Sequence, residues 1–476
     1  MDLSDLTIKD TTDKLKSGIF SCREIVEECF ATIKKNDKKI NAFLTLNEKQ
    51  ALKTADEYDG LIKKDKNIFN EKHLIGIPIA FKDLFSTKNI RTTAGSKIIG
   101  DYYPPYNATA VKKLIDAGVI VIGKTNQDAW GHGSSGENTD YKPTRNPYDL
   151  SRVPGGSSSG SGAAVAYGAA LVGTGTDTGS SVRLPAGFCN LVGLKPTYGR
   201  VSRYGIIAMA SSFDTIGHMT KTVYDNAKVL EVTAGFDPYD ATTVPVKVDQ
   251  YTKSLGQDIK GLKIGIPKEY FVKGLNEAVH DSIKKSLKIL EKLGATVKKI
   301  SLPHTDYAMA CYYILVPSEV SSNLSRYDGV RYGFSREVFG EEAKRRIMLG
   351  SYTLSSGYYD AYYLKAAKVR TLIKQDFVKA FKEVDVLIAP TSPTLPFKIG
   401  EKVDDPLKMY LSDIFLCPAN LAGIPALNIT SGFVGDLPVG MQIIGPQFSE
   451  ELLYKAAYLF EQETQYYKIH PKLKNG

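Results

Sequence analysis

Residues 155–172, GGSSSGSGAAVAYGAALV, have the most unusual composition of any stretch in this chain. Positions 151–210 around them hold twelve Gly, eight Ser and only six charged residues. A flexible linker also contains much glycine and serine, but a linker is polar throughout. Here small apolar residues follow position 162, and these would pack rather than remain in solvent. We therefore predict a buried core segment in which neighbouring backbones approach closely and offer N–H groups to a site.

Short apolar runs alternate with amphipathic helical patterns on either side of this core segment. The apolar runs predict strands at 75–81, 119–122, 262–266 and 384–389. The amphipathic patterns predict helices at 107–117, 275–293, 357–383 and 448–464. Residues 1–70 are expected to be mainly helical, and Ser21 with Glu24 forms a capping box at one helix start. This alternation is typical of an α/β fold with a central mixed, mostly parallel β-sheet covered by helices on both faces.

The length of 476 residues is compatible with about three domains of ~150 residues each. No internal repeat and no other linker-like segment divides the chain, so residues 1–476 are predicted to form a single large domain. With 43% apolar and 24% charged residues, the composition excludes a disordered chain, a fibrous protein and a small disulfide-stapled domain. The net charge of +9 fits a lysine-rich solvated surface better than a surface dedicated to nucleic acid.

Cysteine and histidine are scattered through the chain. The five cysteines include no CxxC pair, and the six histidines include no HExxH pair, so we expect neither a disulfide framework nor a metal site. The first ten residues, MDLSDLTIKD, carry acids and lack the apolar core of a secretory signal. No run reaches the ~18 apolar residues of a membrane span. We expect a cytoplasmic protein, or an organellar matrix protein from which a transit peptide has been removed.

Residues 118–125, GVIVIGKT, match the Walker A expression GxxxxGK[ST]. A phosphate-binding loop needs flexible residues between its glycines, after a strand and before a helix. Here the intervening residues 119–122 are the apolar strand itself. We therefore do not expect a nucleotide at this position.

Two serine clusters stand in glycine-rich turns, GGSSSGSG at 155–162 and DTGSS at 177–181. Such turns direct hydroxyls and successive backbone N–H groups toward one point, which suits a serine nucleophile beside an oxyanion hole. The usual base for a nucleophilic serine is histidine. The nearest histidines in the sequence are His132 and His218, and neither adjoins a cluster.

A desolvated lysine is the alternative base, because burial favours its neutral form. Lys82 is the candidate, since it follows the apolar run IGIPIAF at 75–81. A lysine at the end of a buried strand is more desolvated than one on a helix surface. The competing interpretation is that the Lys82 side chain extends to solvent.

Three blocks resemble the catalytic blocks of the amidase signature family in order and spacing. They are GIPIAFKD at 76–83, VPGGSSSGSG at 153–162 and DTGSSVRLP at 177–185. Segments 198–217, 344–363 and 404–415 are similar to one subgroup, the A subunits of glutamyl-tRNA(Gln) amidotransferases. The resemblance extends over nearly the whole chain.

The resemblance implies a Ser–cis-Ser–Lys catalytic triad. Ser181 would be the nucleophile, Ser157 would lie on a cis peptide and bridge to Lys82, and Lys82 would be the general base and then the general acid. The oxyanion hole would be formed by the backbone N–H groups of Thr178, Gly179, Ser180 and Ser181.

The resemblance also assigns the residues that would bind free glutamine. Arg346 would bind the α-carboxylate, because a guanidinium bonds a carboxylate bidentately. Asp413 would bind the α-ammonium, with a tyrosine from the pair Tyr312 and Tyr313. The alternative for Arg346 is a surface charge, because it lies in the KRR run at 344–346.

The implied function is a glutaminase subunit that supplies ammonia for converting Glu-tRNA(Gln), and potentially Asp-tRNA(Asn), to the amidated aminoacyl-tRNA. The partners would be B-type and small C-type subunits, of which the B-type subunit would use ATP and Mg²⁺. This chain itself would need no cofactor or metal. The alternatives are a stand-alone amidase of the same family and a structural subunit with weakened catalysis.

Several positions depart from the family pattern. Ser159 and Ser180 stand where glycine is usual, and region 332–340 is shorter than in the subgroup. Segment 126–138 differs at Ala129, His132 and Gly136. If position 180 requires a positive φ, a serine there would strain the oxyanion loop.

Overall fold

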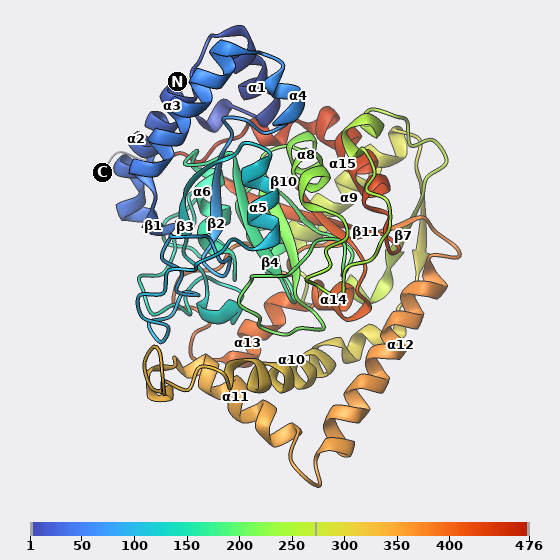
Figure 1. Ribbon diagram of the computed structural model, residues 1–476. Coiled ribbons are helices and arrows are strands. Elements are labelled where there is room, and N and C mark those ends of the chain that lie inside the picture. The colour runs from blue at the N-terminus through green and yellow to red at the C-terminus, as the bar shows by residue number, and fades with distance from the viewer. Residues whose placement is uncertain (1–2, 272–273, 474–476) are drawn as a thin grey trace.

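The computed structural model describes residues 3–271 and 274–473. Eleven strands of the described residues form one sheet in the order β1-β3-β2-β4-β6-β5-β10-β11-β9-β7-β8 (Figure 1). The strands are β1 Phe43–Leu46, β2 Pro78–Lys82, β3 Ile120–Thr125, β4 Val172–Asp177, β5 Val192–Lys195, β6 Thr215–Thr220, β7 Lys263–Pro267, β8 Thr296–Ile300, β9 Val386–Pro390, β10 Ala426–Val434 and β11 Leu437–Ile444.

The strand directions confirm a mixed sheet but not a mostly parallel one. Four of the ten strand pairs in the described residues are parallel, and the other six are antiparallel. The antiparallel share is large because β10 and β11 form a hairpin and because β6 returns between β4 and β5. Strands buried on both faces are apolar throughout whichever way they run, so their sequences did not reveal their direction.

The helices agree closely with the periodic patterns. The described α-helices are α1 Ile8–Ser17, α2 Cys22–Ile40, α3 Glu48–Lys64, α4 Ile68–Glu71, α5 Thr109–Asp116, α6 Ser159–Ala166, α7 Arg183–Phe188, α8 Val223–Thr233, α9 Glu277–Lys292, α10 Ala308–Leu324, α11 Glu341–Thr353, α12 Lys365–Ala380, α13 Pro406–Tyr410, α14 Cys417–Ala422 and α15 Glu450–Thr464. The capping box of Ser21 and Glu24 is present at the start of α2. Two details differ: β1 lies within the helical region 1–70, and the helix expected from 357 begins with a π-helical turn before α12.

Glycines in β4 and β6 bring the core segment against the sheet. A Cβ at Gly175 would lie 2.7 Å from Ser158 Oγ, and one at Gly217 would lie 2.1 Å from the Leu194 carbonyl oxygen and 3.1 Å from a Val182 methyl. Side chains at these positions would therefore keep α6 and the segment before α7 away from the strands. The predicted buried segment with closely approaching backbones is confirmed.

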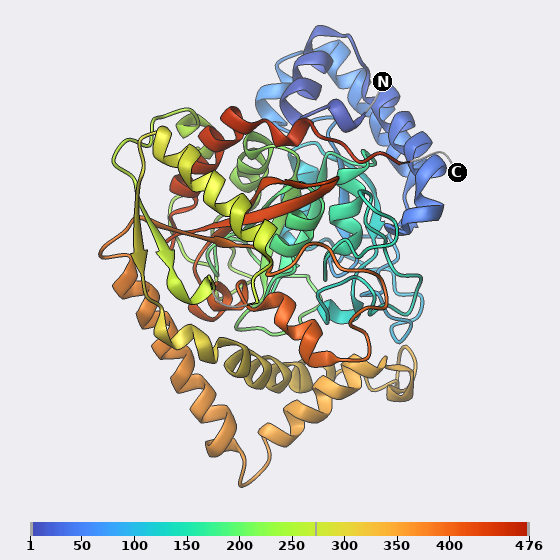
Figure 2. The ribbon, with the colours of Figure 1, turned by 180° about the vertical axis from the view of Figure 1, so that it is seen from behind.

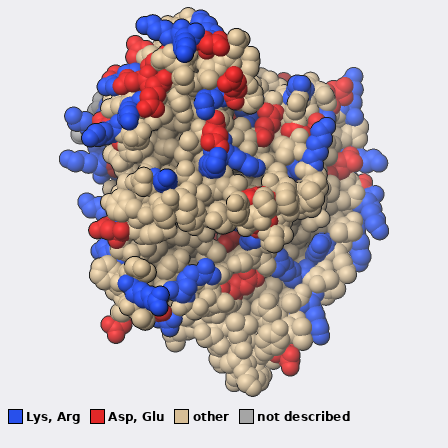
Figure 3. Space-filling model, viewed as in Figure 1, with Lys and Arg blue, Asp and Glu red and all other residues tan. Residues whose placement is uncertain are grey.

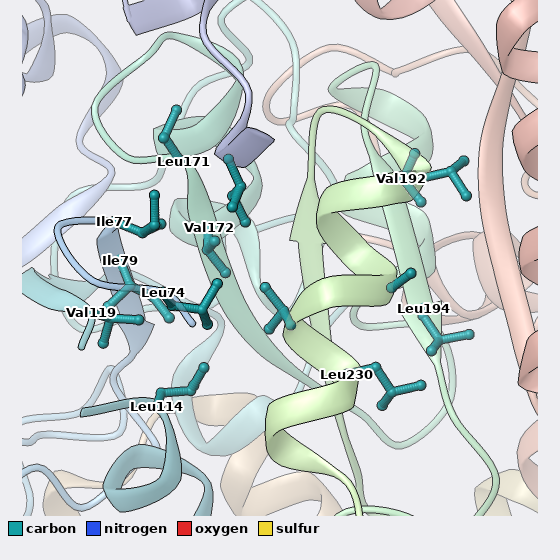
Figure 4. Close-up of a cluster of buried hydrophobic side chains, with 14 of the residues drawn as sticks. Leu74, Ile77, Ile79, Leu114, Val119, Leu171, Val172, Val192, Leu194 and Leu230 are labelled. Atoms are coloured by element: carbon teal, nitrogen blue, oxygen red, sulfur yellow. The ribbon is translucent and has the colours of Figure 1, made fainter. Parts of the chain in front are cut away.

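The opposite face of β6 packs against α8. The ring of His218 contacts Thr233 of α8, with 2.9 Å between Nε2 and Oγ1. Around this contact the apolar core fills the space between the sheet and the helices α5 and α8 (Figure 4). It includes Leu74, Ile77, Ile79, Leu114, Val119, Leu171, Val172, Val192, Leu194 and Leu230. Helices thus cover both faces of the sheet, as the sequence predicts.

A second layer of helices lies at one end of the sheet. The helices α10, α11 and α12 form this layer, at the bottom of Figures 1 and 2. Their apolar side chains pack in a second core with the segments around Trp130 and Phe415. Residues after position 308 are therefore brought next to loops that follow the N-terminal strands.

The molecular surface carries both signs of charge. On the face in Figure 3, Lys and Arg are interspersed with Asp and Glu, and uncharged surface lies between them. Among the residues described, no helix combines the length and apolar character needed to cross a bilayer. Within the same residues, no group of three His, Cys, Asp or Glu side chains is arranged to hold a metal ion.

The contact at Gly217 predicts a large loss of stability on adding one methyl group. Gly217→Ala is expected to lower the free energy of unfolding by about 3 kcal/mol or more, because the methyl meets backbone that cannot move aside. Gly60→Ala is the matched control, since Gly60 lies inside α3 with no atom within 4 Å of the added methyl. That variant is expected to gain roughly 0.5–1 kcal/mol. Urea unfolding followed by circular dichroism measures both changes, and a Gly217→Ala protein as stable as the parent would contradict the packing described.

Candidate active site

Lys82 is the last residue of β2, and its side chain is fully buried. Its Nζ donates hydrogen bonds to Ser157 Oγ at 2.7 Å and to Thr176 Oγ1 at 2.9 Å. Burial lowers the pKa of Lys82 to about 7, although three carboxylates nearby oppose the shift. A large neutral fraction near pH 7 makes Lys82 suitable as a general base. The alternative in which this side chain extends to solvent is wrong.

Ser157 lies in the loop before α6, and the peptide between Gly156 and Ser157 is cis, as the resemblance implied. The Gly156 N–H donates to the Ser134 carbonyl oxygen at 2.8 Å. The Asp128 N–H donates to the carbonyl oxygen of Ser157 at 3.2 Å. Two backbone hydrogen bonds, one on each side of the cis peptide, thus fix the segment that presents the Ser157 hydroxyl to Lys82.

Ser181 follows the carboxyl end of β4, in the turn that leads to α7. Its carbonyl oxygen accepts a hydrogen bond from the Ser158 N–H at 3.2 Å, so the two serine clusters lie side by side. The residue is 5% exposed, whereas Ser157 is 0% exposed. Of the two serines, Ser181 is therefore the one that retains contact with open space.

Ion pairs and hydrogen bonds hold both ends of the turn 178–181. Asp177 accepts bonds from Arg183 Nε and Nη2, each at 3.0 Å, and both side chains are fully buried. Despite the opposing effect of burial, the Arg183 guanidinium keeps the pKa of Asp177 below its usual range. Thr178 Oγ1 donates to Asp214 at 2.7 Å. The backbone N–H groups of this turn are thus held in place before a substrate arrives, which an oxyanion hole requires.

Tyr312, from α10, covers the same turn. A Cβ at Gly179 would lie 2.6 Å from Tyr312 Oη, so only glycine allows this contact. The ring of Tyr313 stacks on that of Tyr410, with 3.7 Å between centroids. Tyr312 thus links the turn after β4 to the layer of helices, and Tyr313 links that layer to α13.

Arg346 is not a surface charge: it is 3% exposed on α11. Its Nε donates to Glu342 Oε1 at 2.8 Å, and its guanidinium lies over the Tyr313 ring, 5.4 Å from the centroid. Although burial opposes it, the charge of Glu342 raises the pKa of Arg346 further. The group therefore stays cationic, and its Nη atoms form no hydrogen bond with the described residues.

Asp413 lies in the short 3-10 helix Leu411–Asp413 and is 4% exposed. Its Oδ2 accepts a hydrogen bond from Ser134 Oγ at 2.7 Å, while Oδ1 has no partner among the described residues. Burial raises the pKa of Asp413 to about 6, although Ser134 and Ser180 favour the ionised form. The positive charge of Arg346 also lowers the pKa of this carboxylate.

Together these residues can carry out nucleophilic acyl transfer on an amino acid amide. Lys82 bonds the Ser157 hydroxyl of one serine cluster, a backbone hydrogen bond joins that cluster to Ser181, and a fixed turn of N–H groups is present for an oxyanion. The buried cation Arg346 and the buried anion Asp413 match the two charges of a free amino acid.

Two of the unusual positions compensate each other. A Cβ at Gly136 would lie 2.5 Å from Ser159 Cβ, so the serine occupies space that Gly136 leaves open. Neither Ser159 nor Ser180 has a positive φ, so neither serine strains the backbone. The predicted strain at Ser180 is therefore absent.

His132 is a buried residue beside the site. It is fully buried, and neither ring nitrogen has a hydrogen-bond partner among the described residues. Burial, with a smaller contribution from the Arg346 charge, holds the pKa of His132 well below its usual value. The neutral imidazole therefore packs beside the candidate site without adding charge to it.

The shortened region lines a cavity of about 980 Å³ next to the site. Its wall is formed by residues 326–328, 330–334, 98–102 and 206–208, together with Ser86 and Tyr106. Tyr327 in this wall packs on the buried Trp130, with ring centroids 4.7 Å apart. Gly131, next to Trp130, lies close to the Ser157 hydroxyl, so this segment stands between the cavity and Ser157.

Three contributors were missed by sequence reasoning. Thr176 is the second acceptor for Lys82, Arg183 holds Asp177, and Asp128 lies against the Ser157 peptide. Arg183 and Asp177 stand within DTGSSVRLP, so their proximity to Ser181 in the sequence was the available signal. No local pattern marks Asp128 or Thr176, because their partners are distant in the sequence.

A family model described as Amidase matches residues 24–454. The chain belongs to the amidase family. This amidase is 52% identical to the A-type subunit of the glutamyl-tRNA(Gln) amidotransferase of Carboxydothermus hydrogenoformans, over 99% of this chain and 100% of the relative. It is 51% identical to the protein of the same name from Listeria monocytogenes, over the same shares of the two chains.

Solved structures of the amidase family share the fold. The A-type subunit of the glutamyl-tRNA(Gln) amidotransferase of Thermotoga maritima superposes with a TM-score of 0.85 at 41% identity, over 100% of this amidase and 99% of that chain. A bacterial aryl acylamidase superposes with a TM-score of 0.87 at 26% identity, over 99% of both chains. The membership predicted from the three blocks is confirmed.

The environment of Asp413 predicts how binding of an amino acid amide depends on pH. An ammonium group binds the ionised carboxylate, and the raised pKa of about 6 means that this form is lost as pH falls through 6. KM for glutamine is expected to be constant above pH 7 and to rise about tenfold per pH unit well below 6. Steady-state kinetics between pH 5 and 8 measure this. Asp413→Asn should have a high, pH-independent KM, whereas the exposed Asp404→Asn should follow the parent; a flat KM in the parent protein would contradict the assignment.

The pair of Gly136 and Ser159 predicts an interaction between two substitutions. Gly136→Ala adds a methyl group that collides with Ser159, and Ser159→Gly removes the collision, although the positive φ at position 136 still opposes alanine. A double-mutant cycle of unfolding free energies is expected to give a coupling of about 1 kcal/mol or more. Additive effects would show that the two positions do not contact.

Proposed function

We propose that this chain hydrolyses the side-chain amide of glutamine and supplies the ammonia to an amidotransferase complex. The observation that carries the proposal is the buried pair of opposite charges, Arg346 and Asp413, beside a lysine–serine relay. An amidase for neutral amides would have no use for both charges. The acceptor we propose is Glu-tRNA(Gln), with Asp-tRNA(Asn) as a second substrate to be tested on the complex.

The proposed reaction begins with attack of Ser181 Oγ on the amide carbon of glutamine. The Ser181 proton passes to Ser157 Oγ as the Ser157 proton passes to neutral Lys82 Nζ. The carbonyl oxygen becomes an oxyanion, which the N–H groups of the turn 178–181 stabilise, each donor being worth ~2.7–4 kcal/mol.

Collapse of this intermediate breaks the carbon–nitrogen bond. Lys82 returns its proton through Ser157 to the departing nitrogen, which leaves as ammonia. A glutamyl ester remains on Ser181, and water attacks it with the same base to release glutamate and regenerate the serine. These steps use only this chain's residues, substrate and water, so we propose no cofactor or metal for this subunit.

We propose that B-type and small C-type subunits are the partners, with ATP and Mg²⁺ used by the B-type subunit. The two bacterial relatives are named as the A-type component of an amidotransferase, which supports an assembly of several subunits. Residues 1–476 would then act as one catalytic domain, since one continuous sheet spans from β1 to β11. Co-expression with these subunits, followed by purification of a tagged partner, tests whether the chains associate.

The second candidate is a stand-alone amidase, because the bacterial aryl acylamidase has the same fold. A panel of small neutral amides distinguishes the two functions. Preference for glutamine that disappears in Arg346→Ala would support the glutaminase. Faster hydrolysis of a neutral aryl amide than of glutamine, with B- and C-type subunits present, would support the stand-alone enzyme.

Variants of the relay test the chemistry. Ser181→Ala and Lys82→Ala are each expected to lower kcat for glutamine by on the order of 10³-fold or more, because the nucleophile or its base is missing. Production of ammonia and glutamate is measured with and without the partner subunits. The exposed Ser151→Ala, at the start of the same segment, serves as the matched control and should retain full activity.

Covalent labelling separates an active site from a purely structural one. A glutamine analogue with a chloroketone in place of the amide is expected to modify Ser181, as located by peptide mass spectrometry. Folded protein that carries no adduct on Ser181 and produces no ammonia with its partners would overturn the catalytic role. The weakened structural subunit would then be the better description.

A further inference from the structure

Asp128 is a fully buried carboxylate at the start of the 3-10 turn Ala129–Gly131, just after β3. Its oxygens accept hydrogen bonds from two backbone N–H groups, that of Gly136 at 3.0 Å and that of Asn138 at 2.9 Å. Its own N–H donates to the carbonyl oxygen of Ser157. Asp128 therefore ties the loop 133–138 to the peptide that carries a relay hydroxyl.

The carboxylate lies directly against that peptide. A Cβ at Gly156 would lie only 2.0 Å from Asp128 Oδ2, and one at Gly133 would lie 2.6 Å from its Cγ. Because these two residues have no side chain, the carboxylate packs directly against the backbone before Ser157. A shift of Asp128 would consequently move the Ser157 peptide as well.

The charges around Lys82 give Asp128 a second role. The carboxylates that act on the Lys82 ammonium are Asp128, Asp214 and Asp177, in decreasing order. Asp177 is already paired with Arg183, and Asp214 interacts with Arg203. Burial raises the pKa of Asp128 to about 7, although the hydrogen bonds from the Asn138 and Gly136 N–H groups lower it; Glu137 raises it further, and the Lys82 charge lowers it. The carboxylate is therefore most fully ionised when Lys82 carries the proton. Asp128 is thus the carboxylate with the strongest effect on Lys82 and no arginine of its own.

We propose that Asp128 is a positioning residue for amide hydrolysis, which holds the Ser157 peptide on Lys82 and balances the ammonium that Lys82 becomes on taking the proton. The proposal rests on the proposed function for its substrate, but not for its geometry. A carboxylate suits this position because it presents acceptors to every donor that faces it. An asparagine would instead turn an N–H₂ group toward a backbone N–H, and it would carry no charge.

Removal of the Asp128 charge is expected to change the pKa of Lys82 in one direction. An anion beside Lys82 favours the protonated lysine, so its loss lowers the pKa of Lys82 below about 7. More of the base is then neutral at low pH, and the acid limb of the activity profile moves to lower pH. Poor alignment of Ser157 has a different effect, because it lowers the rate at every pH.

The experiment compares Asp128→Asn with Asp140→Asn. Asp140 is the matched control, since its Oδ2 likewise accepts bonds from Ser96 Oγ and the Lys97 N–H, each at 2.7 Å, in a neighbouring loop. For Asp128→Asn we expect kcat for glutamine to fall by roughly 10²-fold, with KM changed by less than about threefold. We expect the acid limb to shift down by about one pH unit. Asp140→Asn should match the parent in all three quantities.

A second readout does not depend on glutamine. The rate at which a fluorophosphonate labels Ser181 is measured against pH in the same proteins, and Asp128→Asn should show the same slowing and the same shift. If the parent protein labels normally but lacks glutaminase activity with its partners, the proposed substrate fails while the role of Asp128 is still tested. The two failures are therefore distinguishable.

Two results would overturn the role of Asp128. One is a parent-like rate and acid limb in folded Asp128→Asn; the other is an equal loss in Asp140→Asn, which would indicate a general effect on the loops. Thermal unfolding establishes that each variant is folded. If Asp128→Asn does not fold, Asp128→Glu keeps the charge and displaces it; a lower kcat with an unshifted acid limb would support the proposal, and a parent-like kcat would overturn it.

Discussion

The withdrawal of the Lys82 ammonium from water is the constraint on which the rest of this site depends. An isolated buried ammonium is costly, so the fold must offer hydrogen bonds and nearby negative charge or accept a neutral amine. It does both: Ser157 and Thr176 accept from Nζ, and burial makes the neutral amine accessible near pH 7. The same desolvation that is unfavourable for the charged side chain makes Lys82 suitable as the base of the proposed serine relay.

Close backbone packing makes this burial possible. Gly173 and Gly175 at alternate positions of β4, together with Gly217 of β6, allow the serine-rich segment to lie directly on the sheet, and so bring the Ser157 peptide to the end of β2. The glycine and serine content of residues 151–210 is thus a packing requirement and a catalytic one together. Gly179 likewise allows close packing in the turn after β4, where the Tyr312 hydroxyl lies against its backbone.

The sequence predicts features whose causes are local. The burial of Lys82 could be predicted because it ends an apolar run, and the strand it ends is buried along its whole length. The α/β class and most helices follow from periodicity for the same reason. Strand direction did not follow, because buried strands are apolar whether parallel or antiparallel. Asp128 and the compensation between Gly136 and Ser159 were also inaccessible, since each depends on partners that only the folded chain brings together.

The proposed reaction assigns chemistry and substrate recognition to different parts of the chain. The relay and its supports come from residues 82–214, whereas Tyr312, Arg346 and Asp413 come from the layer of helices and the segment after it. A lineage can therefore exchange the charges that select its substrate without disturbing the bond-breaking machinery. This chain and the aryl acylamidase share the fold at 26% identity, and the proposed division would let one scaffold carry different substrate preferences. It also marks residues 308–413 as the region in which to redesign substrate preference while leaving the catalytic serines untouched.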